Sequence, residues 1–331
     1  TMLLRLVRSN SPLILLLFFA LSIVLWLPAF KGTAYAVFSF DTYQMPFYKI
    51  LYRALEGKYV FQGIVSLIIL LMHCFVLLKM NRKYILLGTQ NYLPAIVFII
   101  LSSSFIQLQR INPGIFAGFF LLLMIDQLFS IYRMKYTLNK LFFSGILVAI
   151  ASLFYFYAVA YFLLIWISLI LLRGVNIREW FVPVLGLVFP YLFVLGYYYI
   201  SDTHSLQEFF GLIVNNIQYG NTITHYNVTY YVFYGFLGLL IIVGGFSLMR
   251  KFPGRKIYIR KYFEIFWWFF ILGAILFFFT DKVYSEIIYL VAIPTSFLLA
   301  DYFNSLRSRV FGEILLFVLV GLVVLVYYIN A

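Results

Sequence analysis

Residues 39–57, SFDTYQMPFYKILYRALEG, separate two long apolar runs and mark where the chain first meets a membrane surface. Pro46 suits the first turn of a helix, and apolar residues recur after it with helical spacing. This apolar stripe comprises Phe47, Ile50, Leu51, Ala54 and Leu55. The opposite face carries charged residues, and Gly57 is a natural stop. The pattern predicts a short amphipathic helix lying in the membrane surface.

The rest of the chain is dominated by apolar runs separated by short charged segments. Of its 331 residues, 65% are hydrophobic and only 11% are charged. Because only helices satisfy every backbone group of such runs inside lipid, the sequence predicts an all-α, polytopic helical membrane protein. It predicts about 11 transmembrane helices and two interfacial amphipathic helices on the periplasmic side. The predicted spans are residues 12–30, 60–80, 91–108, 113–132, 141–157, 158–172, 180–200, 229–249, 264–279, 285–303 and 313–329.

The basic residues indicate an orientation. With these spans and a cytoplasmic N-terminus, 18 of the 24 Lys and Arg residues fall on the cytoplasmic side and six on the other. The C-terminus is then periplasmic, and the expected location is a bacterial cytoplasmic (inner) membrane. The division at Tyr157 is essential to this pattern, because merging the two spans there would invert every later loop. The net charge of +13 thus reflects topology and contact with membrane lipids, and predicts no nucleic-acid partner.

A second outer segment, residues 201–228, resembles the first in its pattern. Ser205 and Glu208 form a capping box, and apolar residues follow on one helical face. That face comprises Leu206, Phe209, Phe210, Ile213 and Ile217. A second surface helix is therefore predicted. His204 and His225 are too far apart for a compact metal motif, so no metal ligands are assigned.

The outer face carries the residues with the best chemical potential. Asp41 is the candidate catalytic base, although a solvated loop aspartate is the simpler interpretation. The candidate substrate- or phosphate-binding residues are Arg110, Lys49, Arg53, Asp202, His204 and Lys282. Arg110 could equally snorkel to lipid headgroups. Motifs for nucleotide hydrolysis, serine hydrolases and zinc sites are missing from the sequence.

Asp126 is an acid within a predicted span, and Gln127 lies beside it. An intramembrane acid is a functional candidate by default, while the pair could also simply tie helices together. The sequence shows no basic residue at a comparable depth. Asp126 and the proline-containing spans are the basis for a third functional hypothesis, a transporter or flippase.

The order of elements resembles the GT-C class of polyprenyl-phosphate-sugar glycosyltransferases. The resemblance is carried by the aspartate after the first span, the amphipathic helix ending in Gly57, and three later stretches. These are SLIILLMHCFVLLKMNRKYILLGTQNYLPAIVFIILSS, NPGIFAGFFLLLMIDQLFSIYR and NKLFFSGILVAIASLFYFYAVAYFLLIWISLILLRG. The family usually has a paired acid in the first outer loop and another before the fourth span. This chain has FDT and QLQRINP there, so only Asp41 carries over, as the implied base.

The resemblance covers about residues 1–200, a GT-C-like module within a single integral membrane domain, 1–331. Residues 201–331 contribute the second outer loop and four C-terminal spans. The whole chain also resembles uncharacterised bacterial integral membrane proteins, some labelled automatically as carotene oxygenases. With three histidines, it lacks the ligands that iron would need.

The sequence leaves two main functional hypotheses. The first is envelope glycan or lipid modification, possibly sugar transfer from a polyprenyl-phosphate donor on the periplasmic side. The second is a non-catalytic membrane subunit or scaffold of a cell-envelope assembly or secretion complex. The expected partners are membrane lipids and possibly a lipid-linked sugar or other membrane subunits. No cofactor is expected, and a divalent metal has no support in the sequence.

Overall fold

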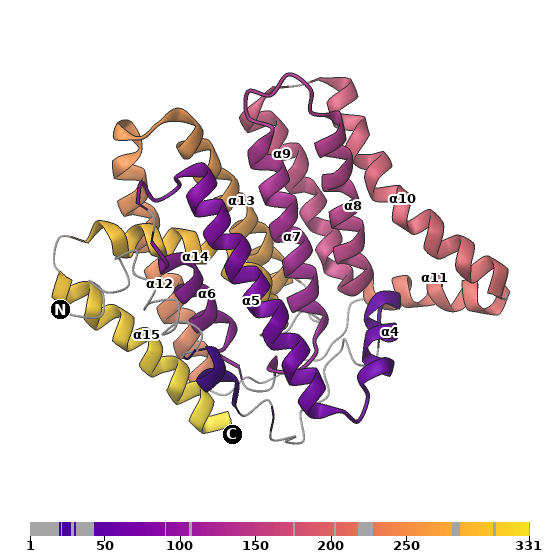
Figure 1. The fold of residues 1–331 in the computed structure, drawn as a ribbon, viewed down its shortest axis with the longest axis horizontal. Coiled ribbons are helices and arrows are strands. Elements are labelled where there is room, and N and C mark those ends of the chain that lie inside the picture. The colour runs from indigo at the N-terminus through magenta and orange to yellow at the C-terminus, as the bar shows by residue number, and fades with distance from the viewer. Residues whose placement is uncertain are drawn as a thin grey trace.

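The computed structural model describes residues 20, 22–27, 30, 43–89, 91–105, 108–174, 176–201, 203–217, 228–279, 285–306 and 309–330, and all regular structure among them is helical (Figure 1). The elements are α4 (Pro46–Leu55), α5 (Tyr59–Tyr84), α6 (Leu93–Ser102), α7 (Pro113–Ser130), α8 (Leu138–Phe154), η3 (Phe156–Tyr161), α9 (Phe162–Leu172), α10 (Ile177–Ser201), α11 (Thr203–Ile217), α12 (Val228–Lys251), η4 (Phe252–Gly254), α13 (Ile257–Phe279), η5 (Ser285–Ile287), α14 (Ile288–Ser305) and α15 (Arg309–Asn330).

Several of these helices have the length and composition of membrane spans. Within the described residues, α5, α7, α10, α12 and α13 are long and apolar enough to cross a bilayer. Their outer surfaces are apolar as well. On α5, the side chains of Ile64, Ile68, Met72 and Phe75 are exposed along one face. Such a surface suits lipid. The predicted all-helical character is confirmed for the described residues, whereas the count of 11 spans stays a prediction.

The centre of the bundle is formed by α6 and α14, which pack against each other. Every residue of α6 is buried. The sequence predicted a span over residues 91–108, but α6 has only 10 residues and is about 15 Å long. It ends at Ser102, where the hydroxyls of Ser102 and Ser104 donate to carbonyls of the preceding turn. That span was therefore predicted too long, because the serines satisfy the last turn and let the chain leave the helix.

α14 is buried along most of its length although it contains Pro294. It contacts α6, α7, α12 and α13. The Phe297 ring stacks on Phe266 of α13 at a centroid distance of 4.7 Å. The Tyr289 hydroxyl donates to the Leu108 carbonyl at 3.0 Å. By contrast, α15 exposes apolar side chains along one face.

The helix break predicted at Tyr157 is present and lies two residues earlier. α8 ends at Phe154, Tyr155 is extended, and the chain continues through η3 into α9. At the far end of α9, Arg173 donates to the carbonyl of Met134, which precedes α8. The start of α8 and the end of α9 therefore meet, so the two helices run in opposite directions.

α8 and α10 pack closely through two glycines. A Cβ atom on Gly145 would lie 2.1 Å from the Pro183 carbonyl oxygen, and one on Gly186 would lie 2.2 Å from that of Phe142. Only glycine permits this backbone approach. Both prolines of α10, Pro183 and Pro190, lie inside the helix.

We expect Gly186→Ala to destabilise the protein by about 1–3 kcal/mol, because the added methyl group must push α8 and α10 apart. The measurement is unfolding in detergent, followed by circular dichroism. Gly196→Ala is the matched control on the same helix, since a Cβ atom there meets nothing within 4 Å. Equal stability of the two variants would contradict the proposed close contact.

Candidate functional site

The bundle has two polar ends. The outer end carries α4 and α11. The inner end carries the helix ends at which Lys83, Arg173 and Arg255 lie. These names follow the orientation that the basic residues predict. The candidate catalytic and substrate-binding residues were predicted at the outer end, whereas Asp126 was predicted nearer the inner one.

α4 begins at Pro46, as predicted, and Gly57 has a φ of +75°, which favours glycine. Its buried face differs from the predicted stripe. The Tyr48 side chain is buried and its hydroxyl donates to the Ile111 carbonyl at 3.2 Å, whereas Ile50 is 68% exposed. Helical spacing identified the helix, and Phe47, Leu51 and Leu55 of the predicted stripe pack against the bundle. Ile50 and Ala54 of that stripe are exposed.

The predicted second helix is present as α11, which runs from the end of α10 back toward the bundle (Figure 1). Its place in the membrane surface stays a prediction. Phe209 is buried against α10 and stacks on Tyr198 at 5.3 Å. The Tyr157 hydroxyl, from η3, donates to the Asn216 carbonyl at 3.0 Å. α4 also approaches α8, where Phe47 meets Phe154 edge to face at 5.6 Å. The two surface helices thus both meet the junction of α8 and η3.

A small hollow lies at this junction, and we call it the outer hollow. It is lined by Tyr43, Met45, Tyr48, Pro113, Phe154, Tyr155, Phe156, Tyr157 and Asn216. Its volume of about 10 Å³ holds roughly one water molecule. The hollow is therefore a packing gap ringed by aromatic side chains, too small for a sugar phosphate.

Glu286 is a residue that the sequence analysis did not select. It is fully buried in η5, and the Tyr155 hydroxyl donates to its carboxylate at 3.3 Å. Its backbone carbonyl lies against Gly114, where a Cβ atom would come within 2.7 Å. The sequence shows only an acid after a cap residue, which gives no sign of burial.

Arg110 is half-buried in the loop between α6 and α7. This loop is held on both sides of Arg110, at Leu108 by Tyr289 and at Ile111 by Tyr48. The loop therefore brings Arg110 to the same end as α4 and η5. Whether it binds phosphate or headgroups stays a prediction.

The other predicted outer residues are not brought together by the described part of the chain. Lys49 is half-buried and Arg53 is exposed on α4. Asp41, Asp202 and Lys282 lie outside the described residues, and so does the His204 side chain, although His204 is in the first turn of α11. Within the described residues, no cluster of His, Cys, Asp and Glu could hold a metal ion.

Asp126 has the basic partner that the sequence did not reveal. Lys83, at the end of α5, places its Nζ atom 2.9 Å from the Asp126 carboxylate. The Tyr84 hydroxyl donates to the same carboxylate oxygen at 2.8 Å. Gln127 is half-buried, and its carbonyl accepts from Ser130. The absence of a partner was therefore wrongly inferred, because Lys83 is 43 positions away and only the packing of α5 on α7 brings it close.

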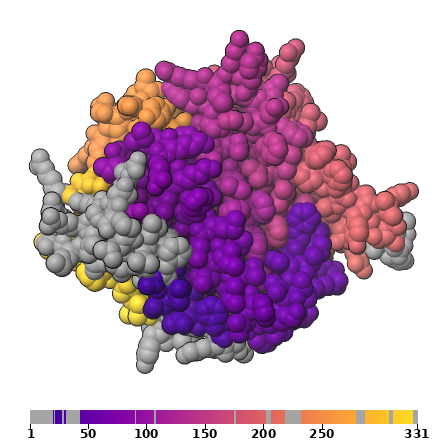
Figure 2. Space-filling model, in the orientation of Figure 1, coloured from indigo at the N-terminus to yellow at the C-terminus, as the bar shows by residue number. Residues whose placement is uncertain are grey.

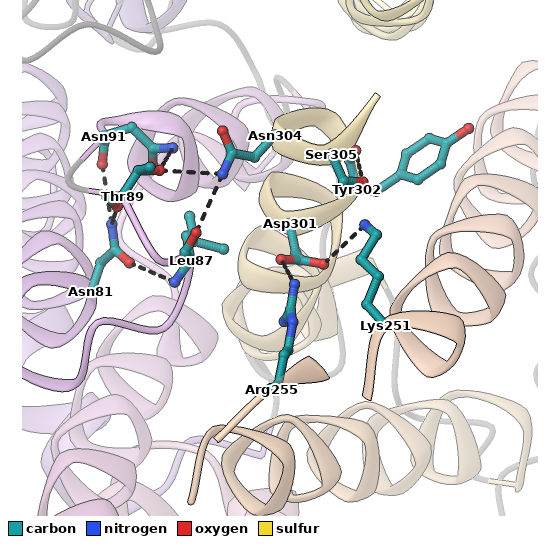
Figure 3. A network of polar contacts seen from close by, with 10 residues as sticks. All are labelled: Asn81, Leu87, Thr89, Asn91, Lys251, Arg255, Asp301, Tyr302, Asn304 and Ser305. Atoms are coloured by element: carbon teal, nitrogen blue, oxygen red, sulfur yellow. Dashed lines mark hydrogen bonds and ion pairs between the residues drawn. The ribbon is translucent and has the colours of Figure 1, made fainter. Parts of the chain in front are cut away.

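Two further acids at the inner end are paired in the same way. Glu179, in the first turn of α10, accepts from Thr137 at 2.9 Å and pairs with Arg173 at 3.1 Å. Asp301, in α14, pairs with Arg255 and lies 3.7 Å from Lys251 (Figure 3). Ion pairs of this kind link α5 to α7, the end of α9 to α10, and the turn between α12 and α13 to α14.

A neutral network beside Asp301 ties the loop after α5 to α14 (Figure 3). Asn304 donates to the Leu87 carbonyl at 3.3 Å and to Thr89 at 3.2 Å. Asn81 donates to the Thr89 carbonyl at 3.4 Å and accepts from the Leu87 amide at 3.3 Å. These polar groups hold the loop after α5 against α14, so they stabilise the inner end of the bundle.

Comparison with protein-family models, with curated proteins and with solved structures gives no match. The GT-C resemblance is therefore neither confirmed nor contradicted. A proposal of function therefore depends on the described residues of this chain.

We expect Tyr84→Phe to destabilise the protein by about 1–2 kcal/mol, because Asp126 loses a buried hydrogen bond. Unfolding in detergent at neutral pH measures the change. Tyr136→Phe is the control, since Tyr136 is 82% exposed. If both variants unfold like the parent protein, Tyr84 does not help to hold Asp126.

Proposed function

We propose that this chain is a non-catalytic subunit or scaffold of a membrane complex in the cell envelope. The observation that carries the proposal is the outer hollow, which has a volume of about 10 Å³. Pockets for drug-sized ligands measure about 300–1,000 Å³. The described part of the outer end therefore offers a packed platform of aromatic side chains, which suits docking better than turnover of a sugar phosphate.

The proposed topology has eleven spans, with the N-terminus in the cytoplasm and the C-terminus in the periplasm of a bacterial inner membrane. Support comes from the inner end, where Lys83, Arg173, Lys251 and Arg255 converge. These four residues were all assigned to the cytoplasmic side. The shorter apolar helices would complete the crossing together with the loops that flank them.

The proposed docking surface runs along α10 and α11. Only 11% of the most apolar stretch of α10 is buried inside the protein, compared with 39–72% for the corresponding stretches of the other four long helices. Leu192, Phe193 and Tyr199 are among its exposed side chains, and α11 adds Phe210 and Ile217. Figure 2 shows this salmon surface projecting from one side of the molecule. Its proposed occupant is an apolar transmembrane helix of another subunit.

We expect a photo-crosslinking amino acid at Leu192 or Phe193 to give a discrete protein adduct in native membranes. Ile68 and Phe75 are the matched control positions, because they are comparably exposed on α5. They should label lipid only. Lipid labelling alone from all four positions would show that α10 faces the bilayer and would contradict the docking surface.

A second candidate, sugar transfer from a polyprenyl-phosphate donor by a GT-C-like module, is favoured by one observation. Asp41 precedes Tyr43 by two positions, and Tyr43 lines the outer hollow beside Tyr155, the partner of the buried Glu286. In this candidate function, the Asp41 carboxylate deprotonates an acceptor hydroxyl and Arg110 neutralises the leaving phosphate.

For this second candidate, Asp41→Asn should abolish transfer from a polyprenyl-phosphate-linked sugar without changing membrane insertion. The assay is transfer of radiolabelled sugar by purified protein in liposomes. Glu208→Gln is a control for general loss of outer charge, because Glu208 is exposed on α11 and is not a candidate binding residue. Undiminished turnover in Asp41→Asn would exclude Asp41 as the base. Absence of turnover in the parent protein would leave only the scaffold proposal.

A further inference from the structure

α12 and α13 follow each other in the chain but are splayed apart. Both helices pack on α14, while their backbones scarcely approach each other. The space between them is bridged at two places. The Trp267 ring lies against Gly245, where a Cβ atom would come within 2.3 Å of it, and Tyr234 meets Phe277 at 5.3 Å. The result is a groove along α14, and we call it the α12–α13 groove.

Two hollows lie along this groove and both are open to the surface. The hollow nearer the outer end of the groove, distinct from the outer hollow described above, has a volume of about 160 Å³. It is lined by Tyr234, Leu237, Gly238, Ile241, Phe270, Gly273, Ala274, Phe277, Phe278, Ile287, Ile288 and Val291. The inner one has a volume of about 220 Å³ and is lined by Ile242, Gly245, Phe246, Met249 and Trp267. This lining is almost entirely hydrocarbon, so at membrane depth the groove suits an acyl chain.

The inner end of the groove is basic. Met249 lines the inner hollow, and Lys251 follows it by two positions. Lys251 and Arg255 share the single carboxylate of Asp301, which leaves an excess positive charge (Figure 3). Among the described residues, the buried Nη1 atom of Arg255 has no hydrogen-bond acceptor. A buried guanidinium nitrogen without an acceptor suits an anionic oxygen.

We propose that the α12–α13 groove binds an acyl chain of an anionic phospholipid whose phosphate lies at Lys251 and Arg255. The charge of the inner end selects the headgroup, and the hydrocarbon lining accepts the chain. A lipid in this position fills the space that the splayed helices leave open. The site lies away from α10 and α11, so it is independent of the proposed docking surface.

The headgroup is tested with the full chain in nanodiscs of equal phosphatidylglycerol and phosphatidylcholine, with retained lipids counted by native mass spectrometry. The parent protein should retain phosphatidylglycerol preferentially. Lys251→Gln should reduce this preference about fivefold, the effect of one basic residue near a headgroup. This variant should still fold because Arg255 remains with Asp301. Lys58→Gln, an exposed lysine between α4 and α5 at the outer end, should leave the preference unchanged.

The groove is tested by filling it. Gly238 lines the hollow of about 160 Å³ in the α12–α13 groove, and a Cβ atom there meets nothing within 4 Å, so the leucine of Gly238→Leu can enter the space without backbone strain. It should reduce the number of retained lipids. Gly321→Leu on α15 is the matched control, because Gly321 is equally open and lies outside the groove. Melting temperatures should be similar for both variants.

A third measurement tests whether the bound acyl chain lies beside Trp267. Phosphatidylglycerol with brominated acyl chains should quench tryptophan fluorescence, and Trp267→Phe should remove much of that quenching. Equal retention of the two lipids by the parent protein would overturn the proposal. So would lipid retention by Gly238→Leu that matches Gly321→Leu, or quenching that Trp267→Phe leaves unchanged.

Discussion

Polar groups that enter this bundle must find their partners inside the protein, because lipid offers none. At the inner end, Asp126, Glu179 and Asp301 each meet a cation from another segment of the chain. At the outer end, the hydroxyls of Tyr48 and Tyr289 donate to carbonyls of the loop before α7. Except for Glu179 and Arg173, which are six positions apart, these contacts link segments far apart in sequence and help to fix which helices become neighbours.

The same constraint shapes the surfaces that remain. α6 and α14 occupy the centre, and the long apolar helices surround them. α10 is attached mainly through its glycine contact with α8 and exposes most of its circumference. α12 and α13 are attached through α14 and leave a groove between them. We propose that a protein helix occupies the surface of α10, because α11 extends this apolar surface beyond the end of α10. A phospholipid suits the groove between α12 and α13, because that groove ends in excess positive charge.

Local patterns predicted the local features well. Pro46 and Gly57 marked the limits of α4, and the capping box of Ser205 and Glu208 identified the segment of α11, although that helix begins two residues earlier at Thr203. Other features escaped because they depend on partners elsewhere in the chain. The buried face of α4 centres on Tyr48 only because its hydroxyl reaches Ile111. The burial of Glu286 likewise depends on Tyr155, 131 positions away. The Asp41 hypothesis stays untested, since that residue lies outside the described part.

By itself, the sequence determined that the chain is helical, that several of its helices are long and apolar enough to cross a membrane, and roughly where most helices lie. Hydropathy, caps and breakers act over a few residues, so they can be read directly from the chain. The tertiary structure alone decided that α6 is a short buried core helix, that Lys83 neutralises Asp126, and that α12 and α13 part around a groove. Those outcomes arise from packing between distant segments, whose complementarity no local pattern records.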